Sequence, residues 1–133
     1  MSTRAVGTTG ETAAIAYLER LGLRLIDKNV QFGPRSGIKG ELDLVAWDGE
    51  TLAFIEVKTR RGSPGQVAPS ENITPAKQRQ LARLAQTYAA RHGLYDDDIT
   101  LRFDVVAVYL AHGESERVLA VHYTRGAFLA GDE

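Results

Sequence analysis

Four residues with chemically useful side chains lie at the two ends of an alternating stretch, GELDLVAWDGETLAFIEVKTR, at residues 40–60. Glu41 and Asp43 are two positions apart, and Glu56 is two positions before Lys58. Carboxylates without a neighbouring histidine or cysteine are hard oxygen ligands, which favour Mg²⁺ or Mn²⁺ over zinc. Such an ion binds a phosphate oxygen and lowers the pKa of a bound water, while a lysine orients that water or offsets charge on the phosphate. These are the parts of a phosphodiester hydrolase, if the fold brings the four side chains together.

The same stretch predicts a β-hairpin, because Asp48-Gly49 is a strong two-residue turn signal between two alternating runs. A turn centred there predicts the cross-strand pairs Trp47–Glu50, Asp43–Phe54 and Glu41–Glu56. Side chains alternate between the two faces of a strand. One face therefore takes apolar positions that we expect in the core: Leu42, Leu44, Ala46, Ala53, Ile55 and Val57. The other face takes four apolar residues near the turn, and the acids and the lysine at the open end: Val45, Trp47, Leu52, Phe54, Glu41, Asp43, Glu56 and Lys58.

The predicted pairing places like charges side by side at the open end of the hairpin. Glu41 directly opposite Glu56 destabilises the hairpin, and each carboxylate raises the pKa of the others unless a cation neutralises them. Lys58 supplies one positive charge, and a divalent metal completes the set. A plain structural hairpin, with its acids paired to Lys58, Arg60 and Lys39, is the alternative. A loop of odd length would also turn Glu56 to the other face.

Composition limits the classes of protein that the chain can represent. Its 133 residues suit a single domain spanning 1–133, and no apolar run is long enough for a membrane span. The absence of cysteine excludes disulfides, thiolate catalysis and zinc–thiolate sites. It also fits a cytoplasmic location, as does a start without the apolar core of a signal peptide.

Charge is distributed unevenly along the chain, although the net charge is only −1. Eight of the sixteen lysines and arginines lie between positions 35 and 83: Arg35, Lys39, Lys58, Arg60, Arg61, Lys77, Arg79 and Arg83. A basic field around a small acidic centre suits a phosphate backbone. An ordinary surface of mixed charge accounts for the same pattern.

The flanking sequence predicts the elements that position the hairpin. A helix begins with a Thr8–Glu11 capping box and ends at Gly22, and residues 23–32 form a strand before a glycine-rich loop. Beyond the hairpin, a long connection at 60–73 leads to a helix that begins at Thr74-Pro75 and ends at Gly93. Strands follow at 99–110 and 116–123, and a short turn and tail close the chain. The order α-β-β-β-α-β-β predicts an α/β sandwich with a mixed sheet.

The hairpin motif resembles the G-E-(I/L)-D-L-(I/V)…E-V-K-x-R signature of the YraN-like family, poorly characterised bacterial proteins of the PD-(D/E)xK nuclease superfamily. The segments GETAAIAYLERLG, ITPAKQRQLARLAQTY and RFDVVAV are also similar to that family's layout. The resemblance implies a restriction-endonuclease-like α/β/α sandwich, related in appearance to Holliday junction resolvases. It further implies that Asp43 and Glu56 bind Mg²⁺, that the Val57 carbonyl completes the metal's coordination, and that Lys58 is catalytic.

Two further acids match the family outside its three core positions. Glu11 matches a glutamate that lies near the metal in resolvase-like members, or it serves only the capping box. Glu41 belongs to the family pattern without being one of the three core positions, and it is a second metal ligand or a tuning residue. The sequence departs from the superfamily where Leu42 replaces a proline, and it lacks a Gln-x-x-x-Tyr pair on the second helix, since Leu84 follows Gln80 by four positions.

Other side chains offer contacts to nucleic acid, each with a structural alternative. Arg35, Lys39, Arg60 and Arg61 suit phosphate contact, or they are solvated loop charges. Lys77 shares a helix face with buried residues, so it either reaches an anionic group or extends its amine to solvent. Trp47 and Phe54 stack on bases or pack in the core. Arg79 and Arg83 are expected in solvent, and no histidine has ligand spacing.

These features together predict a Mg²⁺- or Mn²⁺-dependent endonuclease that acts on DNA, with selectivity for branched structures. A four-way junction as substrate would call for a homodimer. The alternative is a nucleic-acid-binding or adaptor protein that keeps the nuclease fold with little turnover, or an enzyme that needs a protein partner.

Overall fold

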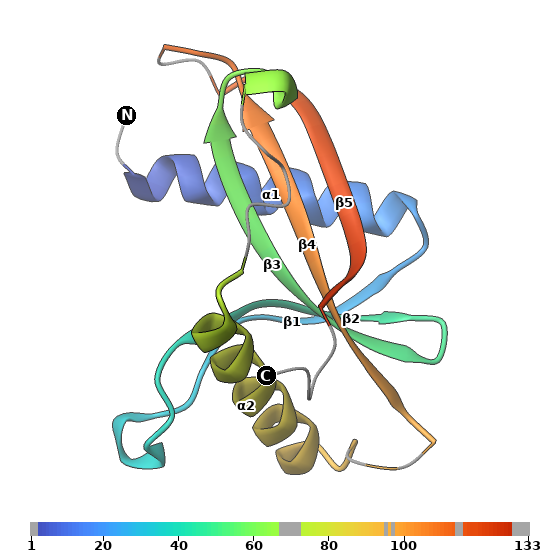
Figure 1. The fold of residues 1–133 in the computed structure, drawn as a ribbon. Helices are drawn as coiled ribbons and strands as arrows, with labels where there is room; N and C mark the ends of the chain where they lie inside the picture. The colour runs from blue at the N-terminus through green and yellow to red at the C-terminus, as the bar shows by residue number, and fades with distance from the viewer. Residues whose placement is uncertain (1–2, 67–72, 95, 97, 114–115, 129–133) are drawn as a thin grey trace.

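The computed structural model describes residues 3–66, 73–94, 96, 98–113 and 116–128 (Figure 1). Its helices and strands follow in the predicted order: α1 (Thr3–Arg20), β1 (Arg24–Gln31), β2 (Glu41–Asp48), β3 (Thr51–Arg61), α2 (Pro75–Arg91), β4 (Thr100–Leu110) and β5 (Val118–Phe128), with 3₁₀ turns η1 (Pro34–Ser36) and η2 (Pro64–Gln66). Among the described helices, none is both long enough and apolar enough to cross a membrane.

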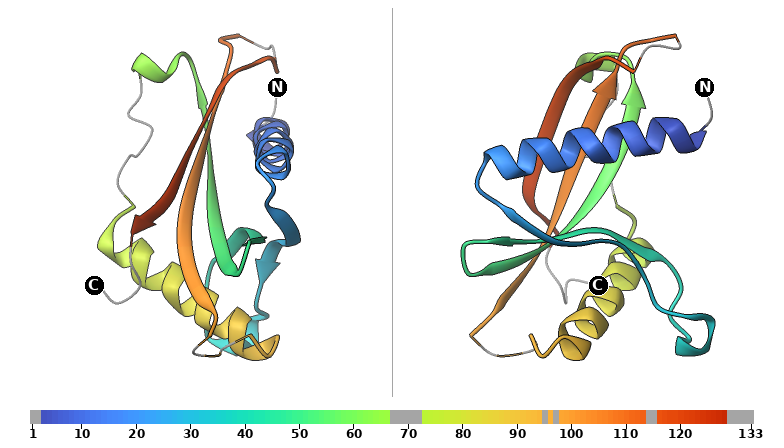
Figure 2. Two further views of the ribbon diagram at one scale, coloured as in Figure 1. Left: turned by 90° about the vertical axis from the view of Figure 1, so that its right-hand side faces the viewer. Right: turned by 180° about the vertical axis from the view of Figure 1, so that it is seen from behind.

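The five strands form one mixed sheet in the order β1-β2-β3-β4-β5. Strands β3 and β4 are parallel and the other neighbours are antiparallel. Parallel neighbours need a crossover connection, and α2 lies within it. Helix α1 covers one face of the sheet and α2 the other (Figure 2). The predicted α/β class is confirmed, and the three layers are consistent with a restriction-endonuclease-like fold.

Each face of the sheet has its own apolar core, as the alternation of the hairpin predicts. Leu44, Ala46, Ala53 and Ile55 are buried beneath α1. Val45, Leu52 and Phe54 pack on α2, where the Phe54 ring meets Tyr88 edge-on with centroids 6.0 Å apart. Trp47 is partly buried against the same cluster, so Trp47 and Phe54 are core residues rather than exposed stacking surfaces. Leu42 is an exception, because it packs in the α2 cluster and not with Leu44.

The hairpin turn differs from the prediction by one residue on each strand. Asp48 pairs with Thr51 and Val45 with Phe54, so Gly49 and Glu50 are the two central residues. Gly49 has φ +61°, and Glu50 has no positive φ. Only the first central residue needs positive φ in a type II′ turn, whereas type I′ needs it at both. The predicted pairs were therefore wrong by two positions, but the even shift leaves the predicted faces unchanged apart from that of Leu42.

The ends of the helices confirm some predictions and correct others. Helix α1 begins at Thr3, so Thr8 and Glu11 lie inside it and the predicted capping box was wrong. Thr74 caps α2 as predicted, since its side chain accepts a hydrogen bond from the Lys77 N–H (3.2 Å). Strand β5 extends five residues past the predicted end at 123. Most of the predicted tail and part of the long connection, 129–133 and 67–72, lie outside the described residues.

Candidate active site

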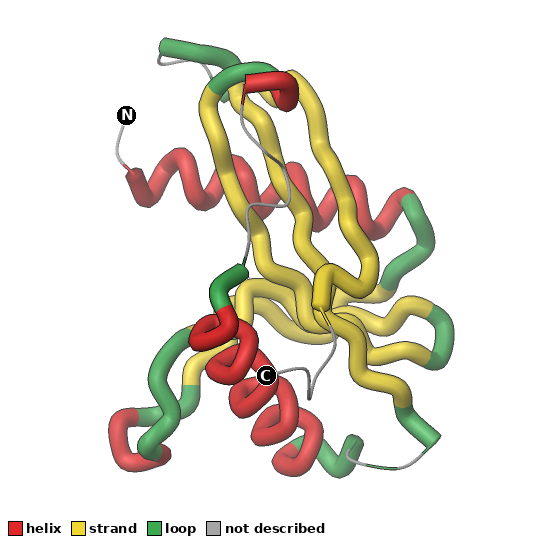
Figure 3. Tube along the Cα trace, in the orientation of Figure 1, coloured by secondary structure: helices red, strands yellow, loops and turns green. Residues whose placement is uncertain are grey.

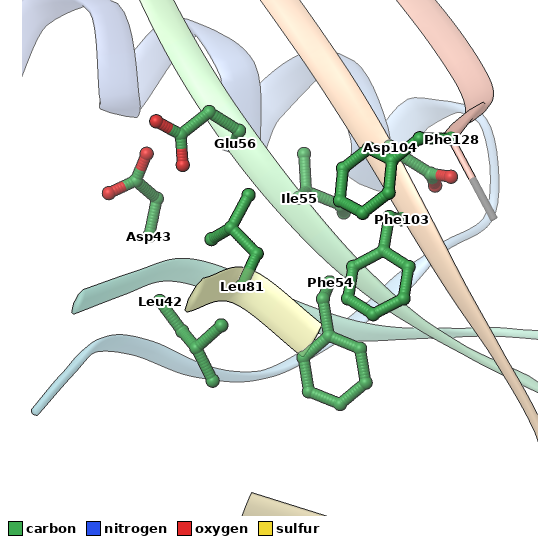
Figure 4. A pocket seen from close by; sticks show the side chains of 9 residues that line it. All are labelled: Leu42, Asp43, Phe54, Ile55, Glu56, Leu81, Phe103, Asp104 and Phe128. Atoms are coloured by element: carbon green, nitrogen blue, oxygen red, sulfur yellow. The ribbon is translucent and has the colours of Figure 1, made fainter. Parts of the chain in front are cut away.

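Asp43 and Glu56 lie level with one another where β2 and β3 separate. The paired residues of the two strands run from Asp48–Thr51 to Leu44–Ile55, and one more step places Asp43 opposite Glu56. Their carboxylates point toward one another (Figure 4). The sequence predicted Glu41 in that place, and the two-position shift of the register corrects it. The structure thus juxtaposes two acids that the family resemblance treats as metal ligands.

The backbone of Val57 faces the same gap. Its N–H donates a hydrogen bond to Asp43 Oδ2 (2.9 Å), so a side-chain oxygen takes a position normally filled by a neighbouring strand. In a β-strand the N–H and C=O of one residue point to the same neighbour. The Val57 carbonyl oxygen is therefore directed toward the side on which Asp43 lies. Two carboxylates and one carbonyl supply hard oxygen donors at this point.

The environment of Asp43 raises its pKa from 3.8 to about 7. Burial is the largest cause, and the negative charge of Glu56 is the next. The hydrogen bond from Val57 and the charge of Lys77 lower the pKa, while Glu41 raises it. The ionised Asp43 is consequently short of positive charge.

Apolar side chains explain why Asp43 is poorly solvated. Asp43 and Glu56 line one end of a small hollow of about 10 Å³, which is space for roughly one water molecule (Figure 4). Leu42, Leu81 and Phe54 form part of its wall. These side chains offer the carboxylate no hydrogen bond, so burial penalises its charged form.

The donor set fits a hard divalent ion in part. Asp43, Glu56 and the Val57 carbonyl are the oxygen ligands that Mg²⁺ or Mn²⁺ prefers, with water filling the remaining positions. Within the described residues, no three Asp, Glu, His or Cys side chains come close enough to enclose an ion. Glu41 is not a third enclosing ligand: its Oε2 accepts a hydrogen bond from Gln31 Nε2 (2.9 Å) in an exposed position. Its negative charge nevertheless acts on Asp43.

Glu11 approaches the site through β1. Its Oε1 accepts a hydrogen bond from Asn29 Nδ2 (3.1 Å). The residues on either side of Asn29 pair with Leu44 and Leu42, which flank Asp43. Glu11 therefore lies one side chain away from the strand position of Asp43. Asn29 and Gln31 were not predicted to lie near the site, although their alternating polar positions in DKNVQF mark one face of β1.

The predicted cations of β3 and α2 differ from one another in their contacts and in their position relative to the acids. Lys58 is half-buried on β3, two residues beyond Glu56 and on the same face by alternation. Lys77, in the first turn of α2, is near enough for its charge to lower the pKa of Asp43. Arg61 donates to the Ala111 carbonyl (2.5 Å) and Arg60 to the Thr59 carbonyl (3.2 Å).

Two more predicted cations lie on the loop between β1 and β2. Arg35 and Lys39 are exposed, and Arg35 lines a hollow that also includes Arg91. Their roles as phosphate contacts stay predictions.

A second acidic network, which the sequence did not reveal, lies at the opposite end of the same hollow. Asp104 is 1% exposed, and its carboxylate accepts four hydrogen bonds. Arg102 donates two of them, the Tyr123 hydroxyl one (2.6 Å) and the Gly126 N–H one. Arg102 also binds Asp48 (2.8 Å). Because β4, β5 and the end of β2 supply these groups, the network fastens the sheet.

Comparison with known proteins identifies related chains over most of the length. Residues 10–108 match the model of the uncharacterised protein family UPF0102. A UPF0102 protein of Chlorobaculum parvum is 42% identical over 131 residues, which cover 96% of this chain and 95% of the relative. A UPF0102 protein of Geobacter sulfurreducens is 44% identical over 85% of this chain and 82% of its own. One of Symbiobacterium thermophilum is 51% identical over 79% of this chain and 82% of its own.

Proposed function

The chain belongs to the uncharacterised protein family UPF0102, the YraN-like family, and we propose that it is a Mg²⁺- or Mn²⁺-dependent endonuclease that hydrolyses phosphodiester bonds in DNA. One observation carries the proposal. Asp43 and Glu56 face one another beside the Val57 backbone, with less positive charge than two ionised carboxylates need. A half-buried like-charge pair whose environment raises the pKa of one member is typical of functional sites.

The residues of the site have separate roles in this proposal. Asp43 and Glu56 hold the ion, and the Val57 carbonyl completes the protein's share of the ligands. When bound, the ion supplies Lewis-acid polarisation of the phosphate and a water of lowered pKa. Lys58 offsets the charge that develops on the phosphate, and the charge of Lys77 lowers the pKa of Asp43. Glu41 and Glu11 adjust the charge of the site from its edge.

The proposal extends to the kind of DNA, the assembly and the location. Exposed Arg35 and Lys39 suit contact with phosphates rather than with base edges, which supports selectivity for structure over sequence. Branched DNA such as a four-way junction is the substrate that we propose. Cutting two strands of such a junction calls for two centres related by symmetry, and so for a homodimer. A cytoplasmic location agrees with the cysteine-free composition.

Cleavage of labelled duplex, single-stranded, flap and four-way DNA in MnCl₂ tests the proposal. Wild type should cut at least one substrate. Lys58→Ala should cut that substrate at least about 100-fold more slowly, because a positioned catalytic side chain contributes about 10²- to 10⁴-fold to the rate. Equal rates in the two proteins would contradict the role of Lys58. Tight binding without cleavage of any substrate would instead favour a nucleic-acid-binding or adaptor protein.

A further inference from the structure

A cationic groove lies between α2 and the loop that precedes β2. It has a volume of about 500 Å³, and three of its lining residues are Lys39, Arg79 and Arg83. Its other lining residues are uncharged. The three cationic residues are exposed, and within the described part of the chain none of their side chains forms an ion pair. A chain with net charge −1 thus concentrates positive charge in one hollow without an acid in its lining.

The two walls of the groove are fastened together. Gln80 Nε2, on α2, donates a hydrogen bond to the Lys39 carbonyl (3.0 Å). Gly40 has φ +102°, and a Cβ built there would lie 2.7 Å from Gln80 Nε2. Only glycine combines that backbone conformation with so close an approach. The loop lies beside α2 (Figure 3). The Gln80 hydrogen bond ties it to the helix.

Both walls of the groove belong to segments that also approach the acidic site. Helix α2 carries Lys77, whose charge acts on Asp43, and then Arg79 and Arg83 within the next two turns. On the other wall, Lys39 precedes Asp43 by four residues, so their Cα atoms are at most about 14 Å apart. Phosphates of one strand advance about 3.4 Å per nucleotide along a duplex axis. The Lys39 wall of the groove is thus within about four nucleotides of a phosphate held at Asp43.

We propose that the groove formed by Lys39, Arg79 and Arg83 binds the phosphate backbone of the DNA strand that leaves the Asp43–Glu56 site. Assigning DNA to this surface rests on the proposed function. Guanidinium groups suit phosphate oxygens because their planar donors bind two oxygens at once. Backbone contacts of this kind set the position of the strand and read no sequence. The groove therefore sets which phosphate reaches the acids.

Fluorescence anisotropy with a fluorescein-labelled 20-base-pair duplex in EDTA, at 50–200 mM KCl, tests this proposal without cleavage. The Arg79→Gln/Arg83→Gln variant should bind about tenfold or more weakly than wild type. The slope of log K against log salt should fall in magnitude by about 1.8, since each phosphate contact contributes about 0.9. The matched control is Arg20→Gln/Arg24→Gln, which removes the same charge from exposed positions at the end of α1 and the start of β1. It should stay within twofold of wild type and keep the salt slope.

Several outcomes would contradict the proposed role of the groove independently of whether the protein hydrolyses DNA. Equal losses of affinity in the two variants would show that only general charge matters. An unchanged salt slope in the groove variant would show that Arg79 and Arg83 do not contact phosphates. Displacement of the duplex by a polyglutamate peptide as effectively as by an oligonucleotide of equal charge would assign the groove to an acidic protein. If wild type cleaves DNA while the groove variant binds like wild type, the groove proposal fails and hydrolysis stands. If wild type cleaves nothing while the groove variant loses binding, the reverse holds.

Discussion

Asp43 and Asp104 line the same hollow, but the fold treats their charges in opposite ways. Asp104 receives four hydrogen bonds, two of them from a guanidinium that is itself fixed by Asp48. Asp43 is described with one, from the Val57 N–H, and it faces a second acid. The fold thus surrounds the Asp104 carboxylate with donors, whereas the half-buried Asp43 carboxylate accepts one hydrogen bond from the described residues. Under the function that we propose, this difference separates a structural network from a site prepared for a cation.

The largest expected effect comes from breaking the complete network. Asp104→Asn should lower the free energy of unfolding by about 3–5 kcal/mol, because it removes one of the two carboxylates that neutralise Arg102 and leaves a buried amide where four donors converge on a carboxylate. Urea unfolding at pH 7 measures this loss. Glu116→Gln, at an exposed position, is the control and should change stability by less than about 0.5 kcal/mol. A loss below about 1 kcal/mol for Asp104→Asn would mean that the network is not structural.

How far the sequence predicts these two regions depends on how local their causes are. Alternation is a property of each strand, and it placed Asp43 and Glu56 on one face correctly even though the register was wrong. The register depended on whether Gly49 is the first or second central residue of the turn, and the sequence signal fits both. The two registers differ by two positions, so every cross-strand partner changed, and Glu56 lies opposite Asp43 instead of Glu41.

The Asp104 network was not predictable for a different reason. Its members come from β4, β5 and the end of β2, and no spacing along the chain connects them. The pattern of RFDVVAV predicts an ordinary buried strand with two charged residues, Arg102 and Asp104. The position of Lys77 near an acid was easier to predict, because a lysine on a buried helix face already suggests a nearby anion.

Metal binding should distinguish the incomplete site from the complete one. At a MnCl₂ concentration of ten times Kd, the ion should stabilise wild type by about 1.4 kcal/mol, which is a rise in Tm of several degrees. Asp43→Asn should remove most of that gain, since it takes away a charged ligand. Differential scanning fluorimetry with and without EDTA measures the change. Glu50→Gln removes an exposed acid from the hairpin turn and should keep the full gain; a loss in both variants would indicate unspecific ion binding.

In the absence of metal, Asp43 should reduce stability as the pH rises. Its pKa is raised from 3.8 to about 7, so the folded state binds the proton more tightly than the unfolded state does. The stability contributed by protonation is present at pH 4 and is lost between about pH 4 and 7. Asp43→Asn in EDTA should therefore be more stable than wild type by roughly 1–2 kcal/mol at pH 8, with a smaller difference at pH 4.5. Urea unfolding at both pH values measures this, and a variant that is less stable than wild type at pH 8 would contradict it.

The smallest effect tests which acid is the partner of Asp43. Glu56 raises the pKa of Asp43 more than Glu41 does, as expected if the register places Glu56 opposite Asp43 and Glu41 toward Gln31. Glu56→Gln should therefore lower the pKa of Asp43 more than Glu41→Gln, although each stabilises the hairpin by only a few tenths of a kcal/mol. Carbon-13 NMR titration of the Asp43 carboxyl in metal-free buffer resolves the two shifts. A larger shift in Glu41→Gln would mean that Glu41 lies nearer to Asp43 than Glu56 does. That result would contradict the register that places Glu56 opposite Asp43, and with it the assignment of Glu56 as the second metal ligand.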